Sequence, residues 1–255
     1  MPELIQTDSE LKAYLLLLER IEQKGERSSR YLELLNSIVS IDFNEISYDD
    51  FLQNKDYLIN IIGETAFLSF KRAIRVFENE EDRVTKPSYR KRLINYDENF
   101  NGSVISVNQL ENITYELIQK PLSSTLSFSF YRPIDNIKKQ RQGYVPCPLT
   151  GDFKFRKNKL HLSIFFRSQD ALNFFIPDVY YFRQLQFEIL KSVKKEDIKN
   201  KFTKAEIGSL NFHYSRVYLP LSMEWKPRQY KNKPEMMKII NKLKNGIRGL
   251  TLDKS

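Results

Sequence analysis

Cys147 is the only cysteine in the chain, and the residues near it are of the types that assist a thiol nucleophile. Arg167 follows it by twenty positions, and Asp170 stands a little further on. A thiolate attacks electron-poor carbon, and a neighbouring guanidinium favours the thiolate while offering a fork of donors to a phosphate. Cys147 is therefore a candidate nucleophile. Two simpler interpretations stay open: an inert, buried cysteine, and an Arg167–Asp170 ion pair at the surface.

The composition narrows the classes of protein to consider. Of 255 residues, 41% are hydrophobic, which is enough for one large domain or for a domain with a helical extension. One cysteine excludes an internal disulfide, and with only two histidines beside it we expect no metal site. No run approaches the roughly 20 apolar residues of a membrane span, and residues 1–4 do not resemble a signal peptide. We therefore expect a soluble, cytoplasmic protein with no membrane partner.

The formal net charge of +9 is concentrated in the basic C-terminal segment, residues 226–255, which alone carries +7. Such a segment can attract the phosphates of a nucleic acid or of a nucleotide. It could equally be the solvated face of a helix, because Met236, Ile239 and Leu243 repeat at helical spacing. Nucleic acid is therefore a possible partner.

The first hundred residues read as a helical region. Residues 7–10 (Thr-Asp-Ser-Glu) fit a capping box before an apolar stripe, and Gly25 is a plausible end for that helix. Further helical patterns span 29–39 and 57–77. Residues 78–102 are charged and weakly periodic, which predicts a long loop or a boundary.

After residue 102 the pattern changes to alternating strands and helices. Residues 104–107 are strand-like, and Asn108 can cap a helix that Pro121 ends. Leu126, Phe128 and Phe130 alternate with serines as in a half-buried strand.

The next segment predicts a hairpin whose turn is Arg-Lys-Asn-Lys at 156–159. A helix stripe follows over 179–189, and a strand over 210–214. The sum is an α+β fold, a sheet with packed helices. Three regions result: 1–100, 101–225 and 226–255.

Three motifs in 104–221 together carry a family resemblance. The first is Pro146-Cys147, a hairpin, and then Arg-Ser-Gln-Asp at 167–170. The second is the helix of 108–121 upstream of the cysteine, and the third is the strand Ile-Gly-Ser-Leu-Asn-Phe-His-Tyr at 207–214. In order and spacing these resemble the core of the thymidylate synthase family, which includes pyrimidine nucleotide hydroxymethylases. The resemblance implies that family's sheet with packed helices, and a homodimer formed through the sheet.

The resemblance also implies a reaction. Cys147 would add to C6 of a pyrimidine nucleotide, so that C5 becomes able to attack a one-carbon donor, 5,10-methylenetetrahydrofolate in this family. Arg167 and Ser168 would bind the substrate phosphate. Asp170 would hold the base and assist proton transfer.

Asp178 falls where the uracil-reading members have asparagine, and members that act on cytosine nucleotides resemble this chain in having aspartate there. Cytosine offers an N3 acceptor and an N4 donor, which a carboxyl group complements. Asp178 could also, or instead, cap the helix that Pro177 opens. Asn211 and His213 point to one strand face, where the resemblance implies contact with the sugar, although the register of these two residues is open.

The chain also departs from the family pattern. Pro148 replaces a histidine, and Ser124-Thr125 stand where an arginine pair supplied by the partner subunit is expected. Phe174 replaces a flexible glycine, and Trp225 is the only tryptophan. These differences weaken the case for folate more than the case for a pyrimidine nucleotide.

Three hypotheses follow. The first is a one-carbon transfer enzyme, either a methyltransferase or a hydroxymethylase, that favours cytosine nucleotides. The second is a non-catalytic nucleotide-binding module of the same fold. The third is a nucleic-acid-associated protein that uses its basic C-terminal segment.

Overall fold

The computed structural model describes residues 2–28, 30–42, 59, 64–79, 88–136 and 145–220. The chain divides into two compact units. The first unit comprises Met1–Ala73, Ser168–Asp178 and Tyr214–Ser255, and the second comprises Ile74–Arg167 and Val179–His213. The basic C-terminal segment lies outside the described residues. In the described part of the chain, no helix is long and apolar enough to cross a membrane.

The sheet of the first unit is arranged around β3 (Tyr31–Ile41), with the strand order β1-β3-β10. β1 (Glu3–Thr7) pairs with β3 in parallel, and β2 (Glu26–Arg27) pairs with β3 antiparallel. β9 (Gln169–Asp170) pairs in parallel with the C-terminal part of β10 (Glu206–Pro220).

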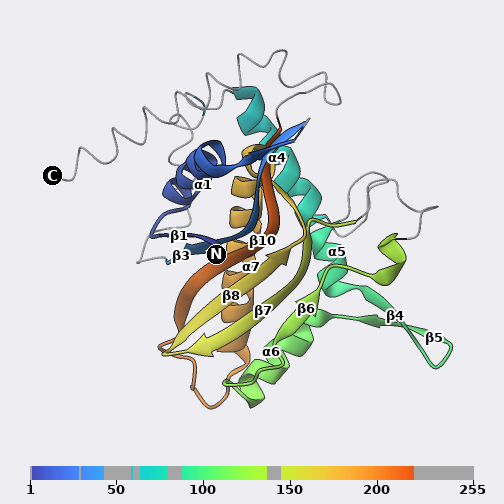
Figure 1. Ribbon diagram of the computed structural model, residues 1–255. Helices are drawn as coiled ribbons and strands as arrows, with labels where there is room; N and C mark the ends of the chain where they lie inside the picture. Colours follow the sequence, from blue (N-terminus) through green and yellow to red (C-terminus); the bar gives the residue numbers. More distant parts are fainter. Residues whose placement is uncertain are drawn as a thin grey trace. The chain divides into compact units, whose positions relative to one another are not determined.

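Helix α1 (Glu10–Lys24) makes the crossover that parallel β1 and β3 require, and it packs on both strands (Figure 1). Ser9 caps the helix, since its side chain accepts from the N–H of Lys12. Gly25 ends it by donating its N–H to the carbonyl of Ile21. The helix that the capping box and Gly25 predict is therefore confirmed.

The prediction of a helix over 29–39 is wrong, because that segment is β3. From Ser37 onward the residues alternate between buried (Ser37, Val39, Ile41) and half-exposed, which is the two-residue period of a strand. The pairing partner is β1, more than thirty residues earlier in the chain. A local helical pattern carries no information about that partner.

The second unit contains a sheet with the strand order β10-β8-β7-β6. β6 (Ser127–Ser129), β7 (Pro148–Arg156) and β8 (Lys159–Phe166) are antiparallel neighbours. The hairpin turn is Lys157-Asn158, both left-handed with φ of 51° and 59°. The predicted hairpin and the strands at 126–130 and 210–214 are confirmed.

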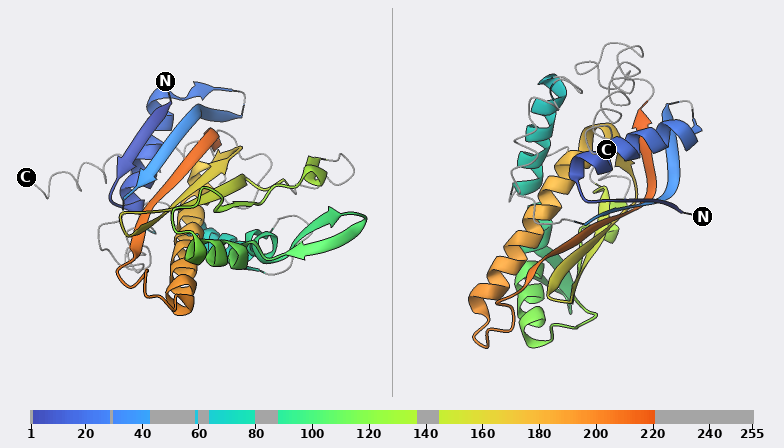
Figure 2. Two further views of the ribbon diagram at one scale, coloured as in Figure 1. Left: turned by 90° about the horizontal axis from the view of Figure 1, so that it is seen from below. Right: turned by 90° about the vertical axis from the view of Figure 1, so that its left-hand side faces the viewer.

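Helix α7 (Ala171–Glu196) belongs to both units, and within the second unit it runs along one face of the sheet together with α6 (Gln109–Gln119) (Figure 2). Asn108 caps α6 as predicted, by accepting from the N–H of Glu111. The core between helices and strands is aromatic; it contains Phe128, Phe130, Phe153, Phe166, Phe182 and Phe212.

The remaining elements of the second unit are short, apart from helix α4. They are α5 (Tyr89–Ile94), β4 (Tyr96–Phe100), β5 (Ser103–Val107), the 3-10 turn Pro133–Asn136 and the end of α4 (Glu64–Glu78). β4 and β5 form a hairpin that projects from the sheet of this unit (Figure 2).

The predicted loop over 78–102 is therefore partly wrong, because α5 and β4 lie within it. A helix of six residues and a strand of five show too few periods to stand out among charged side chains. The predicted strand at 104–107 is confirmed as β5. Of the predicted helix over 57–77, the described part is α4. The fold as a whole is a mixture of helices and open sheet, in agreement with the α+β class.

Candidate functional site

Cys147 stands at the beginning of strand β7, between two buried prolines. Pro148, the first residue of β7, pairs with Phe166 at the end of β8. The main chain of Cys147 is therefore anchored to the residues that lead into Arg167. Its side chain is half-buried.

Three hydrogen bonds tie Arg167 to the loop that holds the cysteine. The N–H of Arg167 donates to the Cys147 carbonyl at 3.0 Å. Its guanidinium donates from Nε to the Pro146 carbonyl at 3.0 Å and from Nη2 to the Val145 carbonyl at 2.8 Å. We call these four residues, Val145, Pro146, Cys147 and Arg167, the Cys147 corner.

The guanidinium of the Cys147 corner keeps donors for a ligand. Nη1 makes no hydrogen bond to a described residue, and the Arg167 side chain is exposed. Two of its nitrogens are held by backbone carbonyls, so the planar group has a fixed orientation and one side left for an anion. The loop that carries the half-buried Cys147 is therefore bound directly to a guanidinium that can bind a phosphate oxygen.

Asp170 lies in the first unit, at the start of helix α7, and is only 4% exposed. Oδ1 accepts from the N–H of Asn173 at 3.1 Å, and Oδ2 accepts from the Asn173 side chain at 2.8 Å. A carboxylate that accepts from the N–H three residues ahead is the pattern of a helix N-cap. The alternative of a surface ion pair is therefore wrong, because Asp170 is buried. Ser168, two residues before it, is half-buried.

Asp178 does not open the helix, and the prediction that it does is wrong. α7 begins at Ala171 and contains Pro177 in its interior. Asp178 is fully buried, and its Oδ2 accepts from the side chain of Gln169 at 2.7 Å. Proline in the first turn is the usual signal for a helix start, but here the helix extends eight residues further toward its N-terminus.

Two residues that the sequence interpretation did not assign to the site accompany Asp178 in the first unit. Gln169 is one. The other is Tyr214, a fully buried residue whose pKa is raised well above its ordinary value by burial and by the negative charge of Asp178. The phenol therefore stays protonated. Tyr214 alternates with Leu210 and Phe212, so its burial follows from the strand pattern, whereas its closeness to Asp178 does not.

Asn211 and His213 lie on the half-exposed face of β10, while Phe212 between them is buried, so the prediction that they share a face is confirmed. His213 stacks on Phe165, with ring centroids 4.6 Å apart. Burial lowers the pKa of His213 below its ordinary value, so the ring is neutral at pH 7.

A row of hydrogen bonds continues on the same face of the second unit. Asn211 donates to the hydroxyl of Ser209 at 3.1 Å, and this hydroxyl lies 2.9 Å from Nδ1 of His161. Nδ1 also accepts from the N–H of Ser209 at 3.1 Å, which assigns the proton of a neutral His161 to Nε2. We call His161, Ser209, Asn211 and His213 the polar row.

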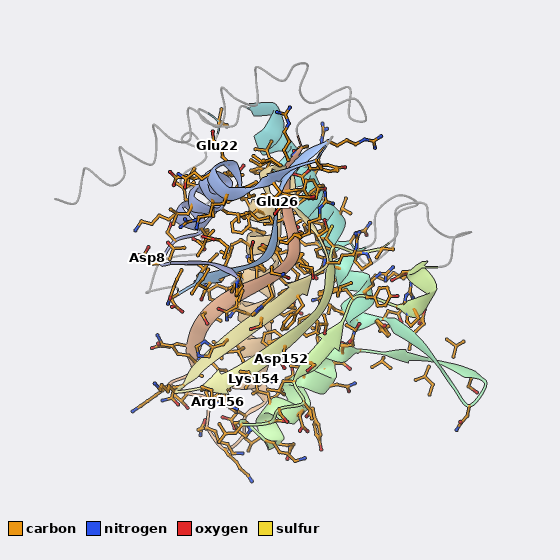
Figure 3. All side chains as sticks on the ribbon, in the orientation of Figure 1. Asp8, Glu22, Glu26, Asp152, Lys154 and Arg156 are labelled. Carbon is orange, nitrogen blue, oxygen red and sulfur yellow. The ribbon has the colours of Figure 1, made fainter. Side chains whose placement is uncertain are left out.

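Charged side chains extend this face along β7, where Asp152, Lys154 and Arg156 follow one another (Figure 3). Lys154 and Asp152 form an ion pair of 2.6 Å.

A separate cavity of about 430 Å³ lies in the second unit. It is lined by residues of α4, α5 and α7: Glu78, Arg90, Tyr181, Gln184, Leu185, Phe187, Glu188 and Lys191. Arg90 and Glu188 form an ion pair of 2.6 Å across its wall. None of the predicted site residues lines this cavity.

The predicted site residues divide between the two units. The first unit holds Ser168, Asp170 and Asp178, and the second holds Cys147, Arg167, Asn211 and His213. Their convergence on one cleft stays a prediction. Within the described ranges, no group of three or more His, Cys, Asp or Glu side chains could hold a metal ion.

Comparison with models of known protein families gave no match, and neither did comparison with curated proteins. The geometry of the two groups of residues, together with the sequence motifs, is therefore the basis for a functional assignment.

Proposed function

We propose that this chain is an enzyme that transfers a one-carbon group to C5 of a pyrimidine nucleotide, with cytosine nucleotides preferred and Cys147 as the nucleophile. The observation that carries the proposal is the Cys147 corner. It binds the loop that carries the chain's only thiol to a guanidinium whose orientation is fixed by two carbonyls and whose Nη1 makes no hydrogen bond to a described residue.

Each step of the proposed reaction has a residue to perform it. Arg167 binds the substrate phosphate through Nη1, with Ser168 as a further donor. The Cys147 thiolate adds to C6, and the electron pair of the C5–C6 bond moves onto C5 and the group at C4. C5 then attacks an electrophile, which is a proton from water in the exchange reaction and a carbon at the oxidation level of formaldehyde in the transfer reaction, where the carrier of that carbon leaves with the bonding electron pair. Loss of the original C5 proton to a base and departure of the thiolate restore the ring.

The roles of the carboxylates follow from the same reaction. Asp178 recognises the base edge, and Asp170 assists proton transfer and holds the base. Asn211 and His213 lie on the half-exposed face of β10, opposite to the buried face on which Tyr214 lies beside Asp178, so the proposal leaves these two residues without a role in binding the same nucleotide.

The sequence supports a folate donor less well than it supports a pyrimidine nucleotide. Phe174 occupies, half-buried, the position where the resemblance implies a flexible glycine. No step of the proposal passes through 5,10-methylenetetrahydrofolate.

A non-catalytic nucleotide-binding module is the second candidate, and the contacts of Asp170 favour it. Both oxygens of Asp170 accept hydrogen bonds from Asn173, so this carboxylate has a role in helix capping that needs no reaction. Such a module would keep the binding of phosphate by Arg167 and lose the exchange of the C5 proton. The third hypothesis, binding of nucleic acid, depends on the basic C-terminal segment, which is outside the described residues.

A homodimer belongs to the proposal. The face that would pair carries the polar row and Phe165, which is 42% exposed. Light scattering over a range of concentrations tests it, and a particle that stays monomeric would exclude the dimer.

The test of the proposed function is release of tritium to water from C5-tritiated CMP, dCMP, UMP and dUMP, each measured with and without methylenetetrahydrofolate. Addition at C6 makes the C5 hydrogen exchangeable, so we expect release from the cytosine nucleotides. Cys147→Ala should abolish release, because the chain has no second thiol. Arg167→Lys keeps the positive charge but loses the planar guanidinium with its several N–H donors, and it should therefore weaken nucleotide binding. Binding of the nucleotides without any release would favour the non-catalytic module.

A further inference from the structure

Gln169 in the first unit has one half of its amide paired and the other half unpaired. Its side chain is fully buried, and Nε2 donates to Oδ2 of Asp178 at 2.7 Å. A carboxylate oxygen that is not protonated can only accept, so the NH2 end of the amide must face Asp178. The other end, Oε1, is buried and has no hydrogen-bond partner among the described residues. Buried acceptors without a donor are rare in folded proteins, and each one calls for an explanation.

The position of Gln169 is fixed by its neighbours. It lies on β9 and pairs with Val217 of β10, in a parallel arrangement that also pairs Asp170 with Tyr218. The main chain of Gln169 is thus held by its pairing with β10, and its side chain is held by the hydrogen bond to Asp178 on α7. An acceptor held in this way is preorganised for a donor that arrives with a ligand.

The hydrogen bond also determines which oxygen of Asp178 can carry a proton. Asp178 carries a negative charge in the free protein, where it raises the pKa of Tyr214, so the proton that faces N3 of a bound cytosine is taken up when the base binds; because Oδ2 accepts from Gln169, that proton resides on Oδ1. The pair then presents a donor, Oδ1–H, and an acceptor, Oε1 of Gln169. Cytosine presents the complementary pair: an acceptor at N3 and a donor at the exocyclic N4.

Uracil presents the opposite pair, a donor at N3 and an acceptor at O4. An ionised Asp178 can accept from N3–H of uracil, so Asp178 by itself does not exclude this base. Oε1 of Gln169 would then face O4, acceptor against acceptor, in either protonation state of Asp178. The amide therefore adds a discrimination that the carboxylate lacks.

We propose that Gln169 is a second specificity-determining residue, whose Oε1 accepts the exocyclic amino group of a cytosine nucleotide while its Nε2 orients Asp178. This inference rests on the proposed function, since it assigns the base of the same site.

Gln186 in the second unit provides the matched control. It too is fully buried, and its Oε1 is also without a partner among the described residues. Its Nε2 donates to the carbonyls of Leu160 and Ser209 on two neighbouring strands, so it links main chain to main chain. A buried, half-paired glutamine alone therefore does not indicate a base-reading residue. The difference at Gln169 is the contact with Asp178 inside the Arg-Ser-Gln-Asp motif.

The experiment measures equilibrium binding of CMP, dCMP, UMP and dUMP by calorimetry, together with the tritium release described above. The variants are Gln169→Met, Gln169→Asn and Gln186→Met. We expect wild-type protein to bind cytosine nucleotides about tenfold more tightly than uracil nucleotides. Gln169→Met removes the acceptor and should bring this ratio close to one, through loss of affinity for cytosine. Gln169→Asn keeps the amide but withdraws it by one methylene, and should lower the ratio as well. Gln186→Met should leave the ratio unchanged.

The outcomes separate this inference from the function on which it rests. If the ratio falls in the Gln169 variants while no protein releases tritium, the base-reading pair stands and the proposed chemistry fails. If tritium is released with no preference for cytosine, or if the Gln169 variants keep the wild-type ratio, the inference is overturned and the chemistry stands. A wild-type protein that binds none of the four nucleotides, or a ratio that falls equally in Gln186→Met, also overturns it. Should Gln169→Met fail to fold, Gln169→Asn decides.

Discussion

The buried carboxylates of the first unit and the polar row of the second unit use similar side chains in different surroundings. Asp170 and Asp178 are 4% and 0% exposed, and each accepts from a side-chain amide that is buried with it. In the polar row, His161, Ser209 and Asn211 are all half-exposed. Inside the protein a hydrogen bond to a carboxylate is strong, and its loss leaves a partner that water cannot reach. On the half-exposed face, water can replace a lost partner.

The stability lost when a polar contact of this molecule is removed therefore depends first on how deeply the contact is buried and only then on the chemical types of its two groups. Within the first unit the two carboxylates also differ from each other. Asp170 is bound by Asn173, three residues away, whereas Asp178 is bound by Gln169 on another element. The first contact forms with the helix itself, and the second requires the strand and the helix to be in place together.

The largest effect is expected for Asp178→Ala. The substitution removes the acceptor of Gln169 Nε2 and leaves that amide buried without a partner. We expect the free energy of unfolding, measured by urea denaturation, to fall by about 2–3 kcal/mol. Asp178→Asn can still accept through its amide oxygen and should cost about 1 kcal/mol.

The control for this prediction is Asp152→Ala in the second unit. Asp152 pairs with Lys154 on the half-exposed face, so its loss should change stability by less than about 0.5 kcal/mol. Equal losses for Asp152→Ala and Asp178→Ala would show that burial does not separate the two regions.

The next effect is expected at Asp170. Asp170→Ala removes the cap of α7 and should lower the free energy of unfolding by about 1–2 kcal/mol. Asp170→Asn keeps an acceptor for the N–H of Asn173 and should cost only a few tenths of a kcal/mol, because asparagine caps helices nearly as well as aspartate.

The asparagine variant also separates the two roles of Asp170. If the carboxylate assists proton transfer, Asp170→Asn should stay folded and lose tritium release from CMP. A stable Asp170→Asn protein with wild-type release would leave Asp170 a helix cap alone.

The elements that the sequence predicted well are those whose information is local and repeated. Helix α1 has several turns of one apolar stripe and a residue of the right type at each end, and the β7–β8 hairpin has alternation on both sides of its turn. β3 was mistaken for a helix because its partner, β1, is distant in the chain.

The candidate site shows the same limit. The motif at 167–170 drew attention to Arg167 and Asp170 from their types and spacing. Their hydrogen bonds, from Arg167 to the Pro146 carbonyl and from Asn173 to Asp170, become visible only in the three-dimensional structure. Asp170 rather than Asp178 caps the helix, because Pro177 is accommodated inside α7. Gln169 went unassigned because nothing local indicates that its amide meets a carboxylate.

A smaller effect is expected from Gly208→Ala, which disturbs the polar row. A Cβ at this position would lie 2.6 Å from Nδ1 and 2.8 Å from Cγ of His161. The ring must move, which breaks its hydrogen bond from the N–H of Ser209. Because the ring is half-exposed, so that water can replace its lost partner, we expect a loss of about 1 kcal/mol in the free energy of unfolding. A loss as large as that of Asp178→Ala would contradict the distinction between the two regions.

The smallest effect is the pH dependence contributed by His213, the member of the polar row whose pKa is lowered by burial. Above its ordinary value of 6.5 the ring is neutral in both the folded and the unfolded chain, and its full contribution to stability is present. As the pH falls below 6.5 the unfolded chain takes up the proton first, so stability decreases until the folded ring is protonated too. His213→Phe keeps a ring to stack on Phe165 but cannot titrate. The measurement compares urea midpoints of wild type and His213→Phe between about pH 8 and pH 5.5. We expect the two curves of urea midpoint against pH to be parallel above neutrality, and the wild-type curve to fall more steeply below it. Curves that stay parallel at every pH would contradict the prediction, because they would mean that His213 is as well solvated in the folded protein as in the unfolded chain.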